Sequence, residues 1–163
     1  MKRIIFHWSA GTYEFDDLDK QHYHFSVDGN GTVHTGSFKP EDNLNGAVGR
    51  YAAHTRGTNE DSIGVAICAM GGATQKPLKF GKWPIKKLQW DALVKLIADL
   101  AKKYKIPVSK STVLSHAEVQ KTLGKPQLGK WDISYLPFDK TIVGATAVGN
   151  KLRAEVSALL AKK

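Results

Sequence analysis

Three residues that lie far apart in the sequence have the types and local contexts of metal ligands. His7 and His116 each follow a short apolar or β-branched segment, at residues 4–6 and 113–115. If these segments are strands lying side by side in one sheet, both imidazoles reach the same edge. Catalytic zinc sites use three protein ligands and keep a fourth position open. Asp132 is a candidate third ligand, because two histidines and a carboxylate together meet that requirement.

The strands that would position these residues are indicated by composition and turn residues. The Asp-Gly and Asn-Gly pairs at 28–31 suit a β-hairpin, because they adopt the positive φ angles that hairpin turns need. A continuous apolar run is typical of a buried central strand, and one begins at Ile63. The sequence predicts strands at 3–8, 22–27, 32–35, 63–70 and 113–115. The last of these leads into a loop that carries His116.

Helical periodicity completes the predicted fold. Apolar residues recur at helical spacing within 86–104, with lysines on the opposite face, and again within 148–160. A short helix is also expected at 46–54. Strands mixed with helices predict an α/β fold, a central mixed β-sheet flanked by helices in a single domain. We expect residues 1–143 to form this domain and residues 144–163 to add an amphipathic helix, docked on it or appended to it.

The net charge of +9 is unevenly distributed along the chain. Residues 1–62 carry six Lys or Arg and nine Asp or Glu, a net charge of −3, whereas residues 76–110 carry ten Lys and two Asp, a net charge of +8. Such a positive face attracts nucleic acid, anionic lipid or an anionic cell-wall polymer. Nucleic acid is disfavoured, because base stacking needs aromatic side chains and few lie among these lysines.

The remaining composition limits the class of protein. A single cysteine, Cys68, excludes an internal disulfide and a cysteine-rich zinc finger, and its apolar context predicts a buried side chain. No apolar run approaches the roughly 20 residues that span a bilayer. The apolar stretch after the basic residues 2–3 is too short for a signal peptide. We therefore expect a protein that is made in the cytoplasm.

Five motifs in order resemble those of the type 2 N-acetylmuramoyl-L-alanine amidases, a family that includes small phage endolysins and peptidoglycan recognition proteins. The resemblance covers roughly residues 4–137. The motifs are IFHWSA at 5–10, HYHF with DGNGTV at 22–33, His54 with NEDSIGV at 59–65, SHAEV at 115–119 and KWD at 130–132. Each motif is common by itself, but all five in this order are hard to obtain by chance.

The resemblance implies a zinc amidase fold with Zn²⁺ held by His7, His116 and Asp132. It places Tyr23 at the position of a catalytic tyrosine and Lys130 at that of a lysine that helps to stabilise an oxyanion. The zinc would polarise the amide carbonyl, and the Lys130 cation would stabilise the tetrahedral oxyanion. Tyr23 could orient the attacking water or help to move its proton, although a phenol of pKa about 10 is a poor base.

Further residues near these positions have expected roles. His54 matches a family position that lines the cleft, and it either contacts substrate or orients a loop. Trp8 and Trp131 flank two proposed ligands, and they either pack in the core or form a wall for the sugar or stem peptide. Some family members use a glutamate as the base, but Glu118 is not our choice for that role. Three other histidines are expected to be structural, at position 24, or superficial, at positions 22 and 34.

The sequence departs from the family pattern around the third ligand. The segment between His116 and Asp132 is longer than in the smallest family members, with residues 121–129 as an inserted loop. Asp132 is followed by Ile-Ser where the family usually has Pro-Gly. Asp132 is therefore the predicted ligand that most needs a structural check.

The resemblance implies a hydrolase that cuts the bond between N-acetylmuramic acid and L-alanine in bacterial peptidoglycan. We expect a monomeric phage or prophage endolysin that acts on the cell wall after holin-type release. The alternatives are a peptidoglycan-binding module without catalysis and a cytoplasmic wall-recycling amidase. No nucleic-acid partner is expected. The helix at 144–163 either docks on the core or engages anionic envelope lipid.

Overall fold

Five strands form one sheet with the order β3-β2-β4-β1-β5 in the computed structural model, which describes residues 1–44 and 49–162. The strands are β1 (Arg3–Trp8), β2 (Phe25–Val27), β3 (Val33–Thr35), β4 (Ser62–Ile67) and β5 (Val113–Ser115). β1 pairs in parallel with β4 and β5, while β2 pairs in parallel with β4 and antiparallel with β3. The sheet is mixed, as the sequence predicts, and β1 has a neighbour on each side.

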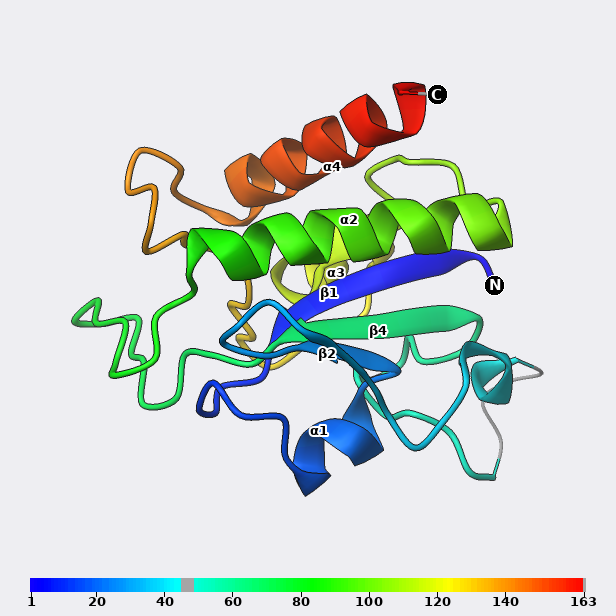
Figure 1. Cartoon of the computed structure of the whole chain (residues 1–163), viewed down its shortest axis with the longest axis horizontal. Coiled ribbons are helices and arrows are strands. Elements are labelled where there is room, and N and C mark those ends of the chain that lie inside the picture. The colour runs from blue at the N-terminus through cyan, green and yellow to red at the C-terminus, as the bar shows by residue number, and fades with distance from the viewer. Residues whose placement is uncertain (45–48, 163) are drawn as a thin grey trace.

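Helices flank the sheet and confirm the predicted α/β class. They are α1 (Asp17–His22), α2 (Lys87–Tyr104), α3 (His116–Leu123) and α4 (Ala145–Ala161), with a 3-10 helix, η1 (Pro40–Asn43). α2 and α4 lie side by side, and α2 runs along the strands (Figure 1). Among the described residues, no helix combines the length and the apolar character needed to cross a membrane.

The alternation of side chains along β1 decides which face of the sheet carries the predicted site. Ile4 and Phe6 belong to the large core cluster that also contains the buried residues of α2 and α4. Ile5 belongs to a smaller cluster with Leu114 and Val119 of α3. Because successive side chains of a strand point to opposite faces, His7 lies on the same face as Ile5, the face on which α3 packs.

The two long helices occur where the periodicity predicts them. α2 buries Leu93, Ile97 and Leu100 of its apolar stripe, and it ends at Tyr104, before Pro107. α4 buries Val148, Leu152 and Val156, which join the same core cluster. Burial of one apolar stripe against a sheet or another helix is the main source of stability for helices of this kind.

Two short helices that the sequence analysis missed correct the predicted boundaries. The strand predicted at 22–27 begins only at Phe25, because α1 extends through His22 and Tyr23 ends it. Asp16 and Asp19 start α1 with a reciprocal pair of hydrogen bonds, in which each carboxylate accepts from the other residue's backbone N–H. The loop predicted for His116 is also wrong, since His116 is the first residue of α3.

The predicted strand at 63–70 and helix at 46–54 also differ from the structure. β4 ends at Ile67, after which the chain turns. Residues 46–48 of the predicted helix lie outside the described residues, and residues 49–54 are not helical. Only the part of residues 121–129 beyond α3 is a loop, because α3 continues to Leu123.

Candidate metal centre

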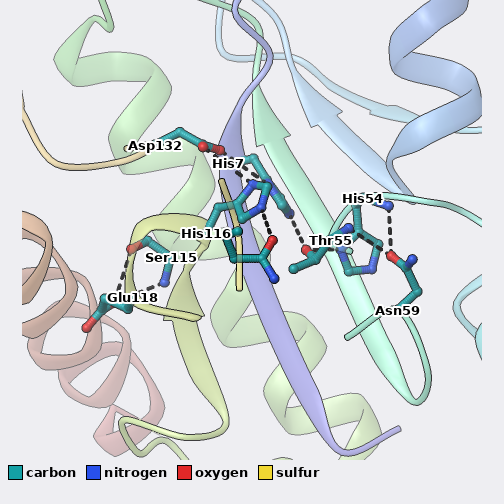
Figure 2. Close-up of polar contacts among 9 residues, drawn as sticks. His7, His54, Thr55, Asn59, Ser115, His116, Glu118 and Asp132 are labelled. Carbon is teal, nitrogen blue, oxygen red and sulfur yellow. Dashed lines mark hydrogen bonds and ion pairs between the residues drawn. The ribbon is translucent and has the colours of Figure 1, made fainter. Parts of the chain in front are cut away.

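Three side chains from distant parts of the chain converge on one point (Figure 2). The Nδ1 atoms of His7 and His116 lie 3.1 Å apart. Asp132 Oδ2 lies 3.3 Å from His7 Nδ1, and Asp132 Oδ1 lies 3.4 Å from His116 Nδ1. All three residues are buried, and one potential ligand atom of each lies within 4.8 Å of the others. The structure therefore brings together the three residues predicted as metal ligands.

The parallel pairing of β1 with β5 places the two histidines next to each other. Phe6 of β1 is in register with Ser115 of β5, so the following residues, His7 and His116, leave neighbouring strands at the same level. His7 is completely buried in the sheet, while His116 opens α3 just beyond the edge strand. Asp132 comes back to the same edge after the loop that follows α3. The shared sheet edge agrees with the sequence-based prediction, and the structure adds that His116 begins α3.

Gln127 sets the tautomer of His116. The Gln127 side-chain amide donates through Nε2 to the carbonyl oxygens of Arg56 at 2.7 Å and Lys125 at 3.3 Å. Its Oε1 therefore faces His116 Nε2, at 2.7 Å, and must accept a hydrogen bond from that nitrogen. With the proton of a neutral ring on Nε2, the Nδ1 lone pair of His116 is free to bind a metal.

A longer chain of hydrogen bonds sets the tautomer of His7. His54 Nε2 lies 3.3 Å from the Ser62 carbonyl oxygen, to which it can only donate. His54 Nδ1 must then accept from the Thr55 hydroxyl, at 2.7 Å. The Thr55 oxygen is left to accept from His7 Nε2, at 3.4 Å, so the His7 Nδ1 lone pair also faces Asp132 and His116.

Burial and charge define the protonation states of this cluster. Burial lowers the pKa of His7 to about 4 and the pKa of His54 well below its usual range. Burial acts to raise the pKa of Asp132, but the contacts with His116 and His7 outweigh it and lower that pKa. When both neutral rings carry their proton on Nε2, as the contacts with Gln127 and Thr55 require, the Nδ1 lone pair of each histidine points toward the Asp132 carboxylate. Such electron-rich groups repel unless a cation lies between them.

An open cleft of about 500 Å³ is lined by two of the three predicted ligands, His116 and Asp132, whereas His7 is completely buried. The predicted catalytic and substrate-contacting residues all line it together with His116 and Asp132: Trp8, Tyr23, His54, Lys130 and Trp131. Lys130 is exposed, so its ammonium group is accessible to a molecule bound in the cleft. A molecule bound in the cleft would therefore contact His116 and Asp132.

The ring of Tyr23 lies against His7, and its hydroxyl remains protonated. Its ring centroid is 5.1 Å from that of His7. Burial, together with the negative charges of Asp132 and Asp19, raises the pKa of Tyr23 well above its usual range. The hydroxyl can donate a hydrogen bond at any physiological pH, but it does not act as a base from the ionised form.

The two tryptophans are in contact with each other at the side of the cleft. Their ring centroids are 4.7 Å apart and their planes meet at 84°, an edge-to-face pair. Trp8 is buried in the core cluster, whereas Trp131 is only half-buried and also contacts Tyr135. Trp131 is the one of the two that presents more surface to the cleft.

The polar atoms of the Glu118 and His54 side chains are hydrogen-bonded to other residues of the chain. Both Glu118 oxygens accept hydrogen bonds, from Ser115 and from Arg153. The side chain points away from the three predicted ligands (Figure 2). Glu118 is thus not placed to act as a general base on substrate in the cleft. Both ring nitrogens of His54 are engaged with Thr55 and Ser62.

Sequence reasoning missed the residues that support the ligands. Thr55 and Gln127 contact the two histidines, and Asn59 Oδ1 accepts from the backbone N–H groups of His54 at 2.9 Å and Thr55 at 2.8 Å. Arg56, which is exposed, also lines the cleft. The only signal was proximity to motif residues, because a hydroxyl or an amide gains such a role only from its tertiary position.

The other histidines lie outside the centre. His24 is fully buried; its Nε2 donates to Asn43 Oδ1 and its Nδ1 accepts from the backbone N–H of Gly64, both at 2.9 Å. His22 is exposed at the end of α1. The predicted surface position of His34 is only partly right, because it is partly buried, stacks on Phe15 and pairs with a carboxylate.

The sequence matches the profile of the N-acetylmuramoyl-L-alanine amidase family over residues 1–132. No curated protein sequence matches the chain. The structure is similar to that of the N-acetylmuramoyl-L-alanine amidase LysC from Clostridium intestinale URNW, with 15% identity, a TM-score of 0.54 and coverage of 96% of this chain and 85% of that chain. The endolysine N-acetylmuramoyl-L-alanine amidase LysCS from the same organism gives 15% identity, a TM-score of 0.54 and coverage of 96% and 83%.

A third similar structure is that of AmiD from E. coli, solved with the substrate anhydro-N-acetylmuramic acid-L-Ala-D-gamma-Glu-L-Lys. The identity is 22% and the TM-score is 0.51, with coverage of 72% of this chain and 48% of that chain. At these identities the likenesses concern the fold, which is the same mixed sheet with flanking helices.

Proposed function

The chain belongs to the N-acetylmuramoyl-L-alanine amidase family, and on this basis we propose that it is a zinc-dependent hydrolase of bacterial peptidoglycan. The bond cleaved would be the amide between N-acetylmuramic acid and L-alanine. The observation that carries the proposal is the convergence of two imidazole Nδ1 atoms and one carboxylate below an open cleft. Two nitrogen donors and an oxygen donor, with a fourth position open, are the donor set of a catalytic zinc site.

The chemistry of the donors fits zinc. Hydrogen bonds from Nε2 leave the Nδ1 lone pairs of His7 and His116 free, and Asp132 supplies negative charge. A zinc ion held there would polarise an amide carbonyl and lower the pKa of water toward neutrality. This arrangement needs no further protein ligand.

The side chains around the ligands would handle the charge that develops on the substrate. Lys130 lines the cleft two residues from Asp132, so its ammonium would stabilise the oxyanion of the tetrahedral intermediate. The Tyr23 hydroxyl, which stays protonated, would donate a hydrogen bond to the same oxygen or to the attacking water. The half-buried Trp131 would form an apolar wall for a sugar ring or a stem peptide.

The decisive experiment combines metal analysis with a digest of purified muropeptides. We expect about one zinc per chain, and products with a new N-terminal L-alanine and a free lactyl group on muramic acid. Chelation and His7→Ala should abolish both zinc binding and cleavage. New reducing sugars instead of new amino termini would mean a glycosidase. Muropeptide binding without cleavage by the zinc-loaded protein would favour the alternative of a binding module.

We also propose that the protein acts as a phage or prophage endolysin on the intact wall. Both the family and the similarity of the fold to an endolysine support this assignment. An endolysin should release muropeptide stems from intact sacculi at least as fast as from small soluble fragments. A clear preference for soluble fragments would instead favour a wall-recycling amidase.

We propose that residues 144–163 are part of the same domain and that their end faces lipid. α4 packs through Val148, Leu152 and Val156, and beside it a hollow of about 1,120 Å³ separates its last turns from α2. Leu159 and Leu160, each more than one third exposed, lie there. Basic residues nearby suit anionic lipid. Replacing both leucines by serine should weaken binding to anionic vesicles and leave muropeptide cleavage intact; unchanged vesicle binding would remove the lipid proposal.

A further inference from the structure

A charged side chain of α4 is buried against α3, the helix that begins with His116, although α4 lies beyond the residues that the family profile matches. Arg153 is 7% exposed. Its Nη1 donates to the Val113 carbonyl at 2.9 Å and to Glu118 Oε1 at 3.2 Å. Its Nη2 donates to Glu118 Oε2 at 2.9 Å and to Asn150 Oδ1 at 3.0 Å. The guanidinium therefore holds the Glu118 carboxylate by both oxygens and the edge strand β5 by a carbonyl.

Glu118 in turn fixes the first turn of α3. Its Oε1 accepts hydrogen bonds from Ser115, from the backbone N–H at 3.0 Å and from the hydroxyl at 3.3 Å. Ser115 directly precedes His116, so the carboxylate spans the residue that carries one proposed ligand. This contact lies on the side of His116 away from His7 and Thr55 (Figure 2).

The same turn also holds the second proposed ligand. The backbone N–H of Ala117 donates to the carbonyl oxygen of Asp132 at 2.7 Å. A shift of the first turn of α3 would thus move His116 directly and Asp132 through this bond. Two of the three ligands depend on the position of one helical turn.

Neither β5 nor α3 is large enough to fix that turn by itself. β5 has three residues and α3 has eight. Among the described strands, β5 pairs only with β1. α4 supplies the missing contact at close range, since Gly149 has no side chain and the Glu118 carboxylate lies where a Cβ would be.

We propose that Arg153 is a positioning residue for the metal centre. Through Glu118 it fixes the first turn of α3, and thereby keeps His116 and Asp132 in the geometry that binds the ion. Arg153 touches neither the metal nor the substrate. The inference rests on the proposed function to the extent that the centre binds zinc.

The test measures zinc affinity in the full chain, in the absence of muropeptide, by competition with a chromophoric chelator. Arg153→Met should weaken zinc binding about 10- to 100-fold, the range found when partners that orient metal ligands are removed. Co²⁺ loaded in place of zinc should show an altered visible absorption spectrum, because its ligand geometry has changed. Arg153→Lys, which keeps the charge but not the paired donors, should restore part of the affinity.

Matched variants separate this role from general damage to α4. Val156→Ala removes a buried side chain of the same helix without touching Glu118, and Lys151→Ala removes a partly exposed cation whose ion pair is with Glu155. Both should bind zinc within about twofold of the parent chain. If Val156→Ala, at an equal loss of stability, weakens zinc binding as much as Arg153→Met, the positioning role is wrong.

The remaining outcomes are also decisive. Arg153→Met with unchanged zinc affinity and cobalt spectrum would overturn the inference while leaving the proposed function intact. A parent chain that binds no zinc would instead overturn the proposed function. If Arg153→Met does not fold, Arg153→Lys carries the test: a loss of about threefold or more in affinity is expected, and no loss contradicts the proposal.

Discussion

The two histidines of the candidate metal centre are held in different ways. His7 lies in β1, which has parallel neighbours on both sides, and its ring is entirely enclosed. His116 opens a short helix after the edge strand β5. Among the described residues, His7 has one long polar contact besides those with His116 and Asp132, 3.4 Å to Thr55, whereas His116 has a short one, 2.7 Å to Gln127. The interior histidine is positioned by the backbone of the sheet, and the edge histidine by side chains.

This difference has a physical reason. A central strand is fixed along its length by two hydrogen-bonded neighbours and by packing on both faces, so its side chains need little further support. A residue at the start of a helix has unsatisfied backbone groups around it and only one strand behind it. The position of His7 is fixed by a second neighbouring strand. The position of His116 is fixed instead by three side chains, those of Gln127, Glu118 and Arg153. Changes to supporting side chains should therefore affect the His116 side more than the His7 side.

The largest expected effect comes from removing Asp132, the residue that contacts both histidines. Asp132→Ala deletes the carboxylate that lies 3.3 Å from His7 Nδ1 and 3.4 Å from His116 Nδ1. We expect zinc affinity to fall by about a thousandfold or more and cleavage to fall to background, since a three-ligand site becomes a two-ligand site. Equilibrium dialysis with zinc measures the first and muropeptide digestion the second. Stoichiometric, tight zinc binding by this variant would show that Asp132 is not a ligand.

Two glycines allow the contacts that support His7 and those that support His116 to be disturbed by the same kind of substitution. A methyl group at Gly64 of β4 would overlap the His54 ring, and one at Gly149 of α4 would overlap the Glu118 carboxylate. Gly64→Ala should reduce the free energy of unfolding by about 1–3 kcal/mol, because it overpacks the middle of the sheet. Gly149→Ala should also reduce it, because the methyl group displaces a carboxylate of a buried ion pair; the preference of helices for alanine, up to about 1 kcal/mol, offsets only part of this loss.

Zinc affinity then distinguishes the two sides. We expect Gly149→Ala to weaken zinc binding roughly tenfold or more, since Glu118 must move. Gly64→Ala should lower stability more than it lowers zinc affinity. Urea denaturation and zinc titration of both variants give the comparison. The reverse order, with affinity lost mainly in Gly64→Ala, would mean that the sheet is the weaker support.

The sequence predicts the three proposed ligands, but it does not predict the side chains that support them. The strand before His7 and the helix at 86–104 follow from periodicity, and the ligand set follows from motifs, so these needed no tertiary information. α3 was missed although Ser115 and Glu118 have the spacing of a helix-start motif, because the segment is too short for an apolar stripe. The link from Arg153 to Glu118 joins residues 35 positions apart, and nothing local in either segment predicts it.

A smaller effect is expected from the hydrogen bonds that set the two tautomers. Gln127→Leu and Thr55→Val each remove the partner of one Nε2 atom with little change of shape. Loss of such a partner weakens metal binding by about 10- to 100-fold. We expect Gln127→Leu to lie toward the upper end and Thr55→Val toward the lower, because the Thr55 contact with His7 is longer. Zinc titration checks the order, and equal effects would contradict the unequal support of the two rings.

The stability of the fold should be sensitive to acid through His24, which lies beside β4, the strand that pairs with β1 and His7. His24, which is fully buried beside β4, accepts the Gly64 N–H through Nδ1, so protonation would break that bond. Burial lowers the pKa of His24 to about 4, against about 6.5 in an unfolded chain. Between these values the unfolded state binds more protons, so the free energy of unfolding should fall as the pH falls from about 6.5 toward 4. Between pH 7 and pH 5 the loss from His24 is on the order of 1–2 kcal/mol.

Urea denaturation of the metal-free protein at pH 7 and pH 5 measures this loss. His24→Gln should be less stable than the parent chain at pH 7 but should lose less on acidification, because one buried titrating group is gone. His22→Gln, at an exposed position of α1, is the matched control and should leave the pH dependence unchanged. The supports of His116 include an arginine, which keeps its charge across this range, so Arg153→Met should shift stability by a similar amount at both pH values. A pH dependence that follows Arg153 rather than His24 would reverse the assignment of the acid-sensitive side.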